Sequence, residues 1–405
     1  MKLSVATFAW YGDSTLNLDF PEEWKVDEHR MIGHDAPPLT DEVIRSRLAN
    51  PIGSDALKEL AKNRKECAII VDDLTRPTKA SQIIPHILHE LHEAGLENQH
   101  IRFIMALGAH HWMRLDDIYK KLGAEIPNRY NVYNHNVYEN NVFVGNTSRG
   151  TPVYVNREVM KCDLKIGVGG IMPHRGFGFG GGAKILLPGV ASIDSITHNH
   201  GLPGVVGRVE TNTRRLDAEE AAQMAGLNFI VNALVNPNRD CCELVCGDPV
   251  KAHRAGVKLA REHYLTTTSK ADIVVVNGYP LESEAYKVFD IIKRSANDSG
   301  DAVVLLHTPE GARGHYYNGR FGGDYGGRNW ASGGYVPKSG GTKNIHVVSP
   351  FISIAENQYF GSSSLWVKSW NDVLVRLKQK YQGSEAKVAV YPYATIQISQ
   401  EEASS

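Results

Sequence analysis

A short apolar segment that runs into a loop of polar residues occurs three times in the first half of the chain. The apolar segments are residues 67–71, 101–107 and 164–168. Residues 81–94 and 116–122, which lie between them, have the pattern of helices. Strands that alternate with helices are typical of parallel sheets, so the sequence predicts an α/β fold with a mainly parallel sheet.

The loops after these three strands carry acidic, basic and imidazole side chains. Ligands of parallel sheets bind beyond the carboxyl ends of the strands, where such loops meet. The residues concerned are Asp72, Asp73, Arg76, His110, His111, His174 and Lys184. We therefore predict that these residues converge on one site, with only one of the adjacent His110 and His111 pointing into it.

The same pattern starts again near residue 268. Residues 270–280 repeat the order of Lys-x-Asp, strand and glycine that residues 161–170 have. We therefore predict two α/β domains with mainly parallel sheets, residues 1–268 and a smaller domain of residues 269–405. The further strands and helices expected in the second domain are residues 302–306, 346–349 and 388–391, and 284–296 and 369–380.

The composition argues against several classes of protein. The 405 residues carry a net charge of −1, which disfavours a nucleic-acid partner bound through bulk charge. No apolar run reaches the roughly 18 residues that a membrane span needs, and residues 1–13 indicate a first strand rather than a signal peptide. The five cysteines have no framework spacing, which favours a reducing compartment, so we expect a cytoplasmic location.

The glycine-rich segment before Lys184 is the most unusual stretch of the chain. Residues 176–182 are glycine with two interleaved phenylalanines. Bare backbone lets a large polar ligand approach N–H groups, and a lysine beside it can be a counter-charge, a nucleophile or a covalent anchor. Ala183 and Ile185 flank the lysine where a phosphate-binding P-loop requires Gly and Ser or Thr. The alternative is a turn that packs a helix on the sheet.

Histidine and arginine side chains suggest acid–base chemistry and anion binding. Two histidines on opposite sides of a substrate can each move one proton, and a third can bind a metal through neutral imidazole. Arg76 can hold phosphate or carboxylate, with an adjacent Asp orienting it or a histidine. A salt-bridged turn is the alternative for Arg76. The candidate histidines are His110, His111, His174, His198 and His200.

Several motifs together resemble one known family, the nickel-pincer-nucleotide-dependent lactate racemases and their 2-hydroxy-acid racemase and epimerase relatives. The glycine–lysine stretch is the most specific of them. The motifs are Asp72-Asp-Leu-Thr-Arg76-Pro, Gly108-Ala-His110, Pro173-His174 through Lys184-Ile-Leu-Leu-Pro-Gly, His198-Asn-His200, Asn228-Phe-Ile-Val-Asn232, Gly247-Asp-Pro-Val-Lys-Ala-His253-Arg and Asn277-Gly-Tyr-Pro.

This resemblance implies two α/β domains with the active-site cleft between them and an isomerase that inverts C2 of a 2-hydroxy acid. His110 and His174 would be the paired general acid and base. Hydride would leave C2 for the cofactor and return to the other face of the ketone. Lys184 would hold the nickel-pincer nucleotide covalently, and His200 would bind nickel, although the adjacent His198 leaves that choice open. The remaining cofactor contacts expected are Asp73, Arg76, Gly180, Gly181 and Gly182.

The second domain departs from the family pattern where substrate is expected to bind. Family members that act on lactate carry Gln and, three residues later, Lys, whereas this chain has Lys287 and then Asp290 after Tyr286. This difference favours a longer or more polar hydroxy acid, such as an aldonate. An exposed pairing between Lys287 and Asp290 is the alternative.

Other functions remain open from the sequence. They are a lactate or other short 2-hydroxy-acid racemase, an oxidoreductase that releases its keto product, and a non-catalytic nucleotide-binding protein. Proteins that make the cofactor are the expected partners for loading. Residues 311–341, rich in Gly and Tyr, are expected to form a lid, an oligomer contact or a surface loop.

Overall fold

The structure is a computed structural model that describes residues 1–311, 344–357, 360, 361 and 363–404. The chain forms two compact units. Residues Asp35–Glu262 make up one of them, called the central unit here. Met1–His34 joins the described residues from His263 to Ser404 in the other, called the terminal unit. The predicted loop of residues 311–341 lies outside the described residues, apart from its first residue.

The central unit is built on a six-stranded sheet with the strand order β13-β12-β9-β4-β5-β6. Every neighbouring pair is parallel except β12 and β13. The predicted α/β fold with a mainly parallel sheet is confirmed. The strands are β4 Cys67–Asp72, β5 Ile101–Ala106, β6 Asn131–Asn134, β9 Leu164–Gly170, β12 Phe229–Val235 and β13 Cys241–Gly247.

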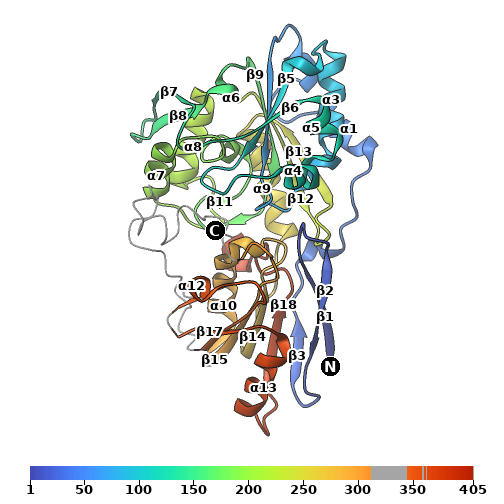
Figure 1. Cartoon of the computed structure of the whole chain (residues 1–405), viewed down its shortest axis with the longest axis vertical. Helices are drawn as coiled ribbons and strands as arrows, with labels where there is room; N and C mark the ends of the chain where they lie inside the picture. The colour runs from blue at the N-terminus through green and yellow to red at the C-terminus, as the bar shows by residue number, and fades with distance from the viewer. Residues whose placement is uncertain (312–343, 358–359, 362, 405) are drawn as a thin grey trace. The chain divides into compact units, whose positions relative to one another are not determined.

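Helices cover both faces of this sheet (Figure 1). Alternate residues of β4 explain the two layers, since Ile69 packs with the helices of one face and Ile70 with those of the other. The first face carries α1 Asp41–Ala49, α2 Leu57–Ala61, α3 Ile84–Glu93, α4 Leu115–Leu122 and α5 Glu125–Arg129. The second carries α6 Arg157–Met160, α7 Ile193–Gly201, α8 Thr213–Met224, α9 Lys251–His263 and the 3-10 helix η4 Gly182–Ile185.

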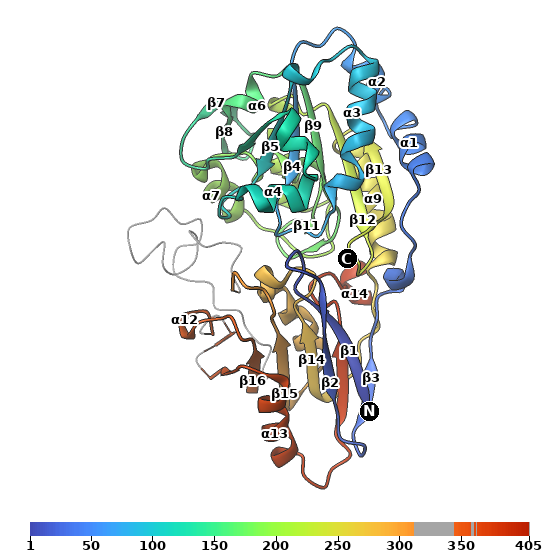
Figure 2. The ribbon, with the colours of Figure 1, turned by 45° about the vertical axis from the view of Figure 1, so that its right-hand side comes forward.

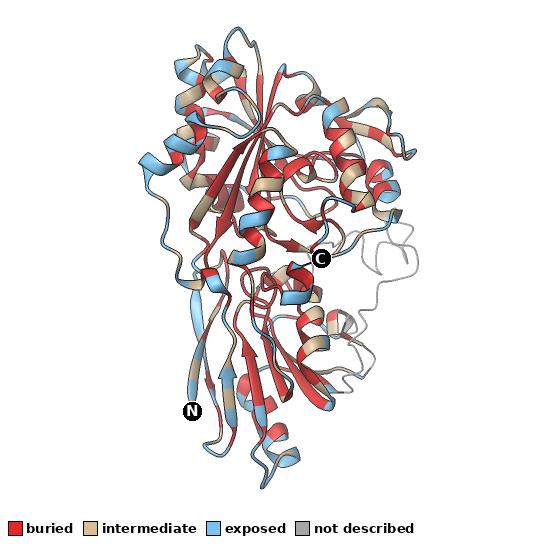
Figure 3. Ribbon diagram, turned by 180° about the vertical axis from the view of Figure 1, so that it is seen from behind, coloured by how far each residue is buried: buried red, intermediate tan, exposed pale blue. Residues whose placement is uncertain are grey.

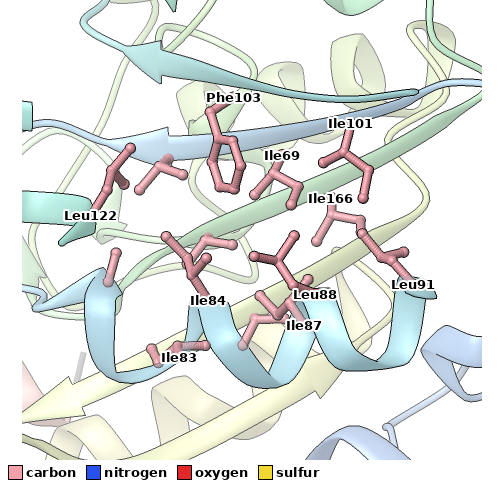
Figure 4. Close-up of a cluster of buried hydrophobic side chains, with 14 of the residues drawn as sticks. Ile69, Ile83, Ile84, Ile87, Leu88, Leu91, Ile101, Phe103, Leu122 and Ile166 are labelled. Atoms are coloured by element: carbon pink, nitrogen blue, oxygen red, sulfur yellow. The ribbon is translucent and has the colours of Figure 1, made fainter. Parts of the chain in front are cut away.

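Helix α3 shows how the sequence pattern produces this packing. Its apolar residues recur at helical spacing and point at the sheet, where they meet side chains of β4, β5 and β9 (Figure 4). The labelled residues of the helix are Ile84, Ile87, Leu88 and Leu91, and those of the strands are Ile69, Ile101, Phe103 and Ile166.

The terminal unit has its own six-stranded sheet with the order β17-β16-β15-β14-β18-β3, and all neighbouring pairs are parallel. The strands of both sheets are mostly buried (Figure 3). The strands are β3 Lys25–Glu28, β14 Ala271–Asn277, β15 Ala296–Leu305, β16 Asn344–Val348, β17 Leu365–Val367 and β18 Lys387–Tyr391. An antiparallel hairpin, β1 Lys2–Thr7 and β2 Ser14–Asp19, packs on this sheet with α13 Trp370–Lys380; the shorter helices are η5 Glu282–Val288, α10 Phe289–Ser295, α12 Ile354–Asn357 and α14 Gln400–Ala403.

The first residues of the chain correct the predicted division into residues 1–268 and 269–405. Strand β3 pairs with β18 near the other end of the chain, with Lys25 opposite Lys387 (Figure 2). Val5, Leu18 and Trp24 pack in the same core as β14 and β18. Pairing between such distant segments leaves no local trace in the sequence, which is why residues 1–34 were assigned to the wrong domain.

Most predicted helices and strands are confirmed, with ends that shift by a few residues. Helix α7 was not predicted, because its segment Ile193–Gly201 follows a glycine-rich stretch and has only a weak apolar pattern. Small polar residues begin it instead, since the Ser192 side chain accepts from the backbone N–H of Ser195. Within the described residues, no helix is both long and apolar enough to cross a membrane.

A buried histidine makes the stability of the central unit depend on pH. His135 donates from Nε2 to the carbonyl of Ala191 over 3.0 Å and accepts from the Asn156 amide over 3.1 Å. Burial lowers the pKa of His135 to about 4. The unfolded chain therefore binds this proton first as pH falls, and stability present above the unfolded pKa, 6.5, is lost toward pH 4.

We expect His135→Gln, which keeps a donor and an acceptor but does not titrate, to flatten this dependence. Between about pH 7.5 and about pH 4.5, wild type should lose about 1–3 kcal/mol more unfolding free energy than the variant. Urea unfolding at both pH values measures the difference. An equal loss in the two proteins would contradict the assignment.

Candidate active site

The loops after β4, β5 and β9 meet at the carboxyl edge of the central sheet, as predicted. These three strands are neighbours in the sheet. The N–H of Gly108, after β5, donates to the carbonyl of Gly189, five residues beyond Lys184, over 2.8 Å. The N–H of Gly170, at the end of β9, donates to Asp72 Oδ2 at the end of β4 over 3.0 Å. Hydrogen bonds therefore join the ends of β4 and β9 and link the loops after β5 and β9.

Asp73 and His110 form a close pair in this region. His110 Nδ1 lies 2.5 Å from Asp73 Oδ2. The N–H and hydroxyl of Thr75 donate to the other oxygen, Asp73 Oδ1, over 3.0 and 2.5 Å. Arg76 donates to the Thr75 hydroxyl over 2.9 Å. Because the carboxylate accepts at Nδ1, the other ring nitrogen of His110, Nε2, is the one that can accept a proton from a ligand.

The charge of Asp73 is secured by its partners. Burial opposes ionisation of this carboxyl group, which is 3% exposed. The interactions with His110, Arg76 and Thr75 outweigh that effect and hold the pKa of Asp73 well below its usual range. Asp73 is therefore an ionised acceptor for the N–H at Nδ1 of His110. Arg76 donates to the carbonyl and to the hydroxyl of Thr75, and its charge is one of the causes that lower the pKa of Asp73.

Asp72, unlike Asp73, has a structural role. Its Oδ1 lies 2.6 Å from Nζ of Lys121, a fully buried lysine on α4. The same Nζ donates to the carbonyl oxygens of Asp73 and Arg76 over 3.0 and 3.1 Å. One lysine thus fixes the whole turn that presents Asp73. Both carboxylate oxygens of Asp72 therefore have protein partners: Oδ1 contacts Lys121, and Oδ2 accepts the N–H of Gly170.

His174 and Lys184 lie together beyond β9. His174 Nδ1 accepts the backbone N–H groups of Gly176 and Phe177 over 3.2 and 3.3 Å, which leaves the ring proton on Nε2. Lys184 Nζ lies 3.4 Å from that Nε2 and 4.7 Å from the centroid of the Phe177 ring. The amine of Lys184 is therefore held beside an imidazole, in a half-buried position.

The structure distinguishes between the two histidines of α7. His200 donates from Nδ1 to the carbonyl of Ile196 over 3.1 Å, so its Nε2 carries the lone pair that a metal requires. Its ring lies 5.5 Å from that of Phe177, the ring beneath Lys184. His198 is exposed and contacts the hydroxyl of Thr151 over 2.8 Å. Geometry thus favours His200 for the metal. Among the described residues, no three His, Cys, Asp or Glu side chains form a metal-binding group.

The glycines before Lys184 pack against protein. The N–H of Gly180 donates to the carbonyl of Met172 and that of Gly182 to the side-chain oxygen of Asn232, both over 2.7 Å. Gly182 has a φ of +60°, and a Cβ there would lie 2.8 Å from the ring of His253. The N–H groups of Gly180 and Gly182 are therefore bonded within the protein, as in a packing turn, and the contact of Gly180, Gly181 and Gly182 with a cofactor stays a prediction.

Arg215 holds the same glycine segment from its carbonyl side. This guanidinium is fully buried and donates to the carbonyl oxygens of Gly181, over 2.8 Å, and of Phe177 and Phe179. Burial is the main cause that lowers the pKa of Arg215, to about 9. Gly181 has a φ of +73°, which glycine adopts without strain. Arg215 thus fixes the conformation of the glycine-rich segment 176–182, which in turn sets the position of Lys184.

Sequence reasoning missed four residues that support this site. Lys121 could have been noticed as a lysine three positions after Ile118, on the apolar face of its helix. Asn232 and His253 lie in motifs that carried the family resemblance, but nothing in the sequence pattern gave them a role. Arg215 left no local signal, because its partners lie on a distant loop.

The predicted substrate residues lie in the terminal unit. Lys287 is 6% exposed, and its Nζ lies 2.6 Å from Oε2 of Glu284, which is fully buried. Lys287 therefore does not lie on an exposed face of its helix. Tyr286 packs against the core of its unit, and Asp290 stands in the first turn of α10.

Known proteins resemble the chain over most of its length. Residues 11–212 match the family model of the lactate racemase N-terminal domain. Lactate racemase of Thermoanaerobacterium thermosaccharolyticum is 28% identical over 317 residues, 75% of this chain and 74% of that protein. Lactate racemase of Lactiplantibacillus plantarum is 29% identical over 292 residues, 68% of this chain and 69% of that protein.

Solved structures share the fold. The apoprotein of the T. thermosaccharolyticum lactate racemase superposes with a TM-score of 0.74 at 22% identity, over 98% of this chain and all of that one. A Thermotoga maritima protein gives a TM-score of 0.66 at 18% identity, over 90% of this chain and 99% of that one. The arrangement of strands and helices is thus common to these proteins.

Proposed function

Because this chain belongs to the lactate racemase family, we propose that it is an isomerase that inverts C2 of a 2-hydroxy acid. The Asp73–His110 pair is the main support for this reaction. The hydroxyl of the substrate must lose its proton before C2 can become a ketone carbon. The carboxylate of Asp73 at Nδ1 orients the His110 ring so that Nε2 can take that proton.

His174 is the second proton carrier in this proposal. Its ring proton lies on Nε2, on the side where Lys184 stands. His110 Nε2 can accept the hydroxyl proton, and His174 Nε2–H can hydrogen-bond the substrate oxygen and give up a proton when the His174 ring is doubly protonated. They come from loops after different strands, as two groups serving opposite sides of one substrate should.

The residues fit a nickel-pincer nucleotide attached to Lys184. The donor set is suitable, since an amine can be acylated and the unprotonated Nε2 of His200 can bind nickel. Three cations surround Phe177, with Lys184 Nζ at 4.7 Å, Arg215 Cζ at 5.5 Å and Arg214 Cζ at 5.8 Å from the ring centroid. Such positive charge favours a phosphate-bearing ligand.

When bound, this cofactor would supply a hydride acceptor for C2 and return the hydride to either face of a planar ketone. The chain itself would do the remaining work. Lys184 would anchor and His200 would orient the group, while His110 and His174 would move the hydroxyl proton. Cytoplasmic proteins that make the cofactor would have to load it.

We propose a longer or more polar hydroxy acid than lactate, such as an aldonate, as substrate. Support comes from the departures at Lys287 and Asp290 from the family pattern. The ammonium of Lys287 already faces the buried carboxylate of Glu284. A substrate carboxylate would have to share it.

Incubation of the cofactor-loaded protein with single isomers of lactate and of several aldonates, in D₂O, tests this function. We expect inversion at C2 of aldonates, seen by chiral chromatography, with the original hydrogen retained at C2. Preference for lactate would correct the substrate, and accumulating keto acid would indicate an oxidoreductase. Deuterium at C2 would contradict hydride transfer.

A further inference from the structure

Asp217, on α8, is a fully buried carboxylate that lies outside the proposed machinery. Its Oδ1 accepts the hydroxyl of Thr147 over 2.6 Å. Its Oδ2 accepts the hydroxyl of Thr151 over 2.8 Å and the side-chain amide of Asn199 over 2.7 Å. Asn199 stands on α7 between His198 and His200. Asp217 is thus bound directly to the turn that carries the metal-ligand candidate.

The amide of Asn199 can point only one way. Its Nδ2 donates to Asp217 Oδ2 and to the carbonyl of Arg214, over 2.7 and 3.0 Å, and both partners are acceptors. The amide oxygen is buried and has no hydrogen-bond partner in the part of the chain that the structure describes. Asp217 and the Arg214 carbonyl therefore determine the orientation of this side chain, and with it the rotation of α7.

A second link runs from Asp217 to His198. The Thr151 hydroxyl gives its proton to Asp217, so it accepts the proton on Nδ1 of His198 over 2.8 Å. The carboxylate thereby holds His198 away from the ring of Phe177. Residues two apart on a helix point in different directions, so the same hold leaves His200 facing Phe177.

Arg214 closes the end of α7. Its guanidinium donates to the carbonyl oxygens of His200 and Leu202 over 2.5 and 2.8 Å, which satisfies acceptors that a helix end leaves open. The final turn of α7 is therefore fixed at its side by Asp217 and at its end by Arg214.

We propose that Asp217 is a positioning residue that sets His200 toward the nickel of the bound cofactor and keeps His198 out of that role. This inference rests on the proposed function. Asp217 touches no substrate or cofactor group and acts through Asn199 and Thr151. Groups that orient a metal ligand in this way typically change metal affinity about 10–100-fold when they are removed.

The test compares Asp217→Asn with Asn199→Ala, each loaded with cofactor by co-expression. Glu220→Gln is the matched control, because Glu220 lies one turn along the same helix. Its side chain binds the Ser148 hydroxyl over 2.6 Å and Arg149 over 3.1 Å, in the turn between strands β7 Asn141–Asn146 and β8 Pro152–Asn156 that also carries Thr147 and Thr151. Nickel loss to a chelator is followed by atomic spectroscopy, and hydrogen exchange of residues 196–202 by mass spectrometry.

We expect Asp217→Asn and Asn199→Ala to lose nickel about 10–100-fold faster than wild type, with faster exchange in residues 196–202. Glu220→Gln should match wild type in both measurements. If Asp217→Asn does not fold, nickel loss and hydrogen exchange in Asn199→Ala test the inference. Nickel retention equal to wild type in the folded variants would overturn the inference alone, whereas a wild-type protein without nickel would overturn the proposed function.

Discussion

Replacing Asp73 by Asn is expected to lower kcat about 10²–10⁴-fold without preventing cofactor loading. Nδ1 of His110 now meets a carboxylate at 2.5 Å, which keeps Nε2 ready to accept a proton. An amide in that place can donate to Nδ1, and the ring proton then moves to Nε2, where it blocks proton acceptance.

The control for this variant is the neighbouring imidazole. His111→Ala should leave kcat close to wild type, since His111 Nδ1 contacts the carbonyl of the next residue, Trp112, over 3.0 Å. His110→Ala should reproduce the loss seen with Asp73→Asn, and the double variant should be little worse than either, because the two residues act as a unit. Steady-state kinetics with nickel content measured in parallel separates catalysis from loading. Wild-type kcat in Asp73→Asn would contradict the role of the pair.

Lys121→Met is expected to destabilise the central unit by about 3–5 kcal/mol, because it leaves the Asp72 carboxylate buried without its cation. Burial lowers the pKa of Lys121 and raises the pKa of Asp72, so loss of water disfavours the charged form of both side chains. The pair persists through the 2.6 Å contact and the carbonyls that share Nζ. When Lys121 is replaced, the Asp72 carboxylate remains buried and desolvated but no longer has the ammonium group that compensated for the loss of water.

Lys120→Met is the matched control, since Lys120 is adjacent on the same helix. Its Nζ lies 3.4 Å from Asp117 and its side chain is 29% exposed. Asp117 keeps the backbone N–H and the guanidinium of Arg114 as partners when Lys120 is replaced, so this variant should lose much less stability than Lys121→Met. Equal stability of Lys120→Met and Lys121→Met would show that the buried pair does not hold the Asp73 turn.

The fold was predictable where strands and helices alternate with clear apolar patterns. Ile69 and its neighbours form an apolar run too short for a helix, and polar residues follow at once, so both the strand and the site at its end could be anticipated. The same reasoning placed His110 and His174 after neighbouring strands. It failed for β3, because a four-residue edge strand has no local sign of its distant partner β18.

The supporting residues of the site were less accessible. Arg215 and Lys121 are charged residues that the sequence would assign to the surface, yet both are fully buried by partners that are distant in sequence. The glycines at 180 and 182 suggested a ligand cradle because bare backbone is compatible with both a ligand and close protein packing. The positions of Asn232 and His253 show which protein groups lie beside Gly182, and they could not be foreseen from the sequence.

The attachment of the cofactor at Lys184 is the central claim, and mass spectrometry of the intact protein tests it most directly. The chain should be produced together with the cofactor-making enzymes, with Lys184→Arg as the control. We predict an added mass that digestion assigns to the peptide with Lys184, stoichiometric nickel, and neither in Lys184→Arg. Unmodified, metal-free protein that still inverts a 2-hydroxy acid would contradict the account.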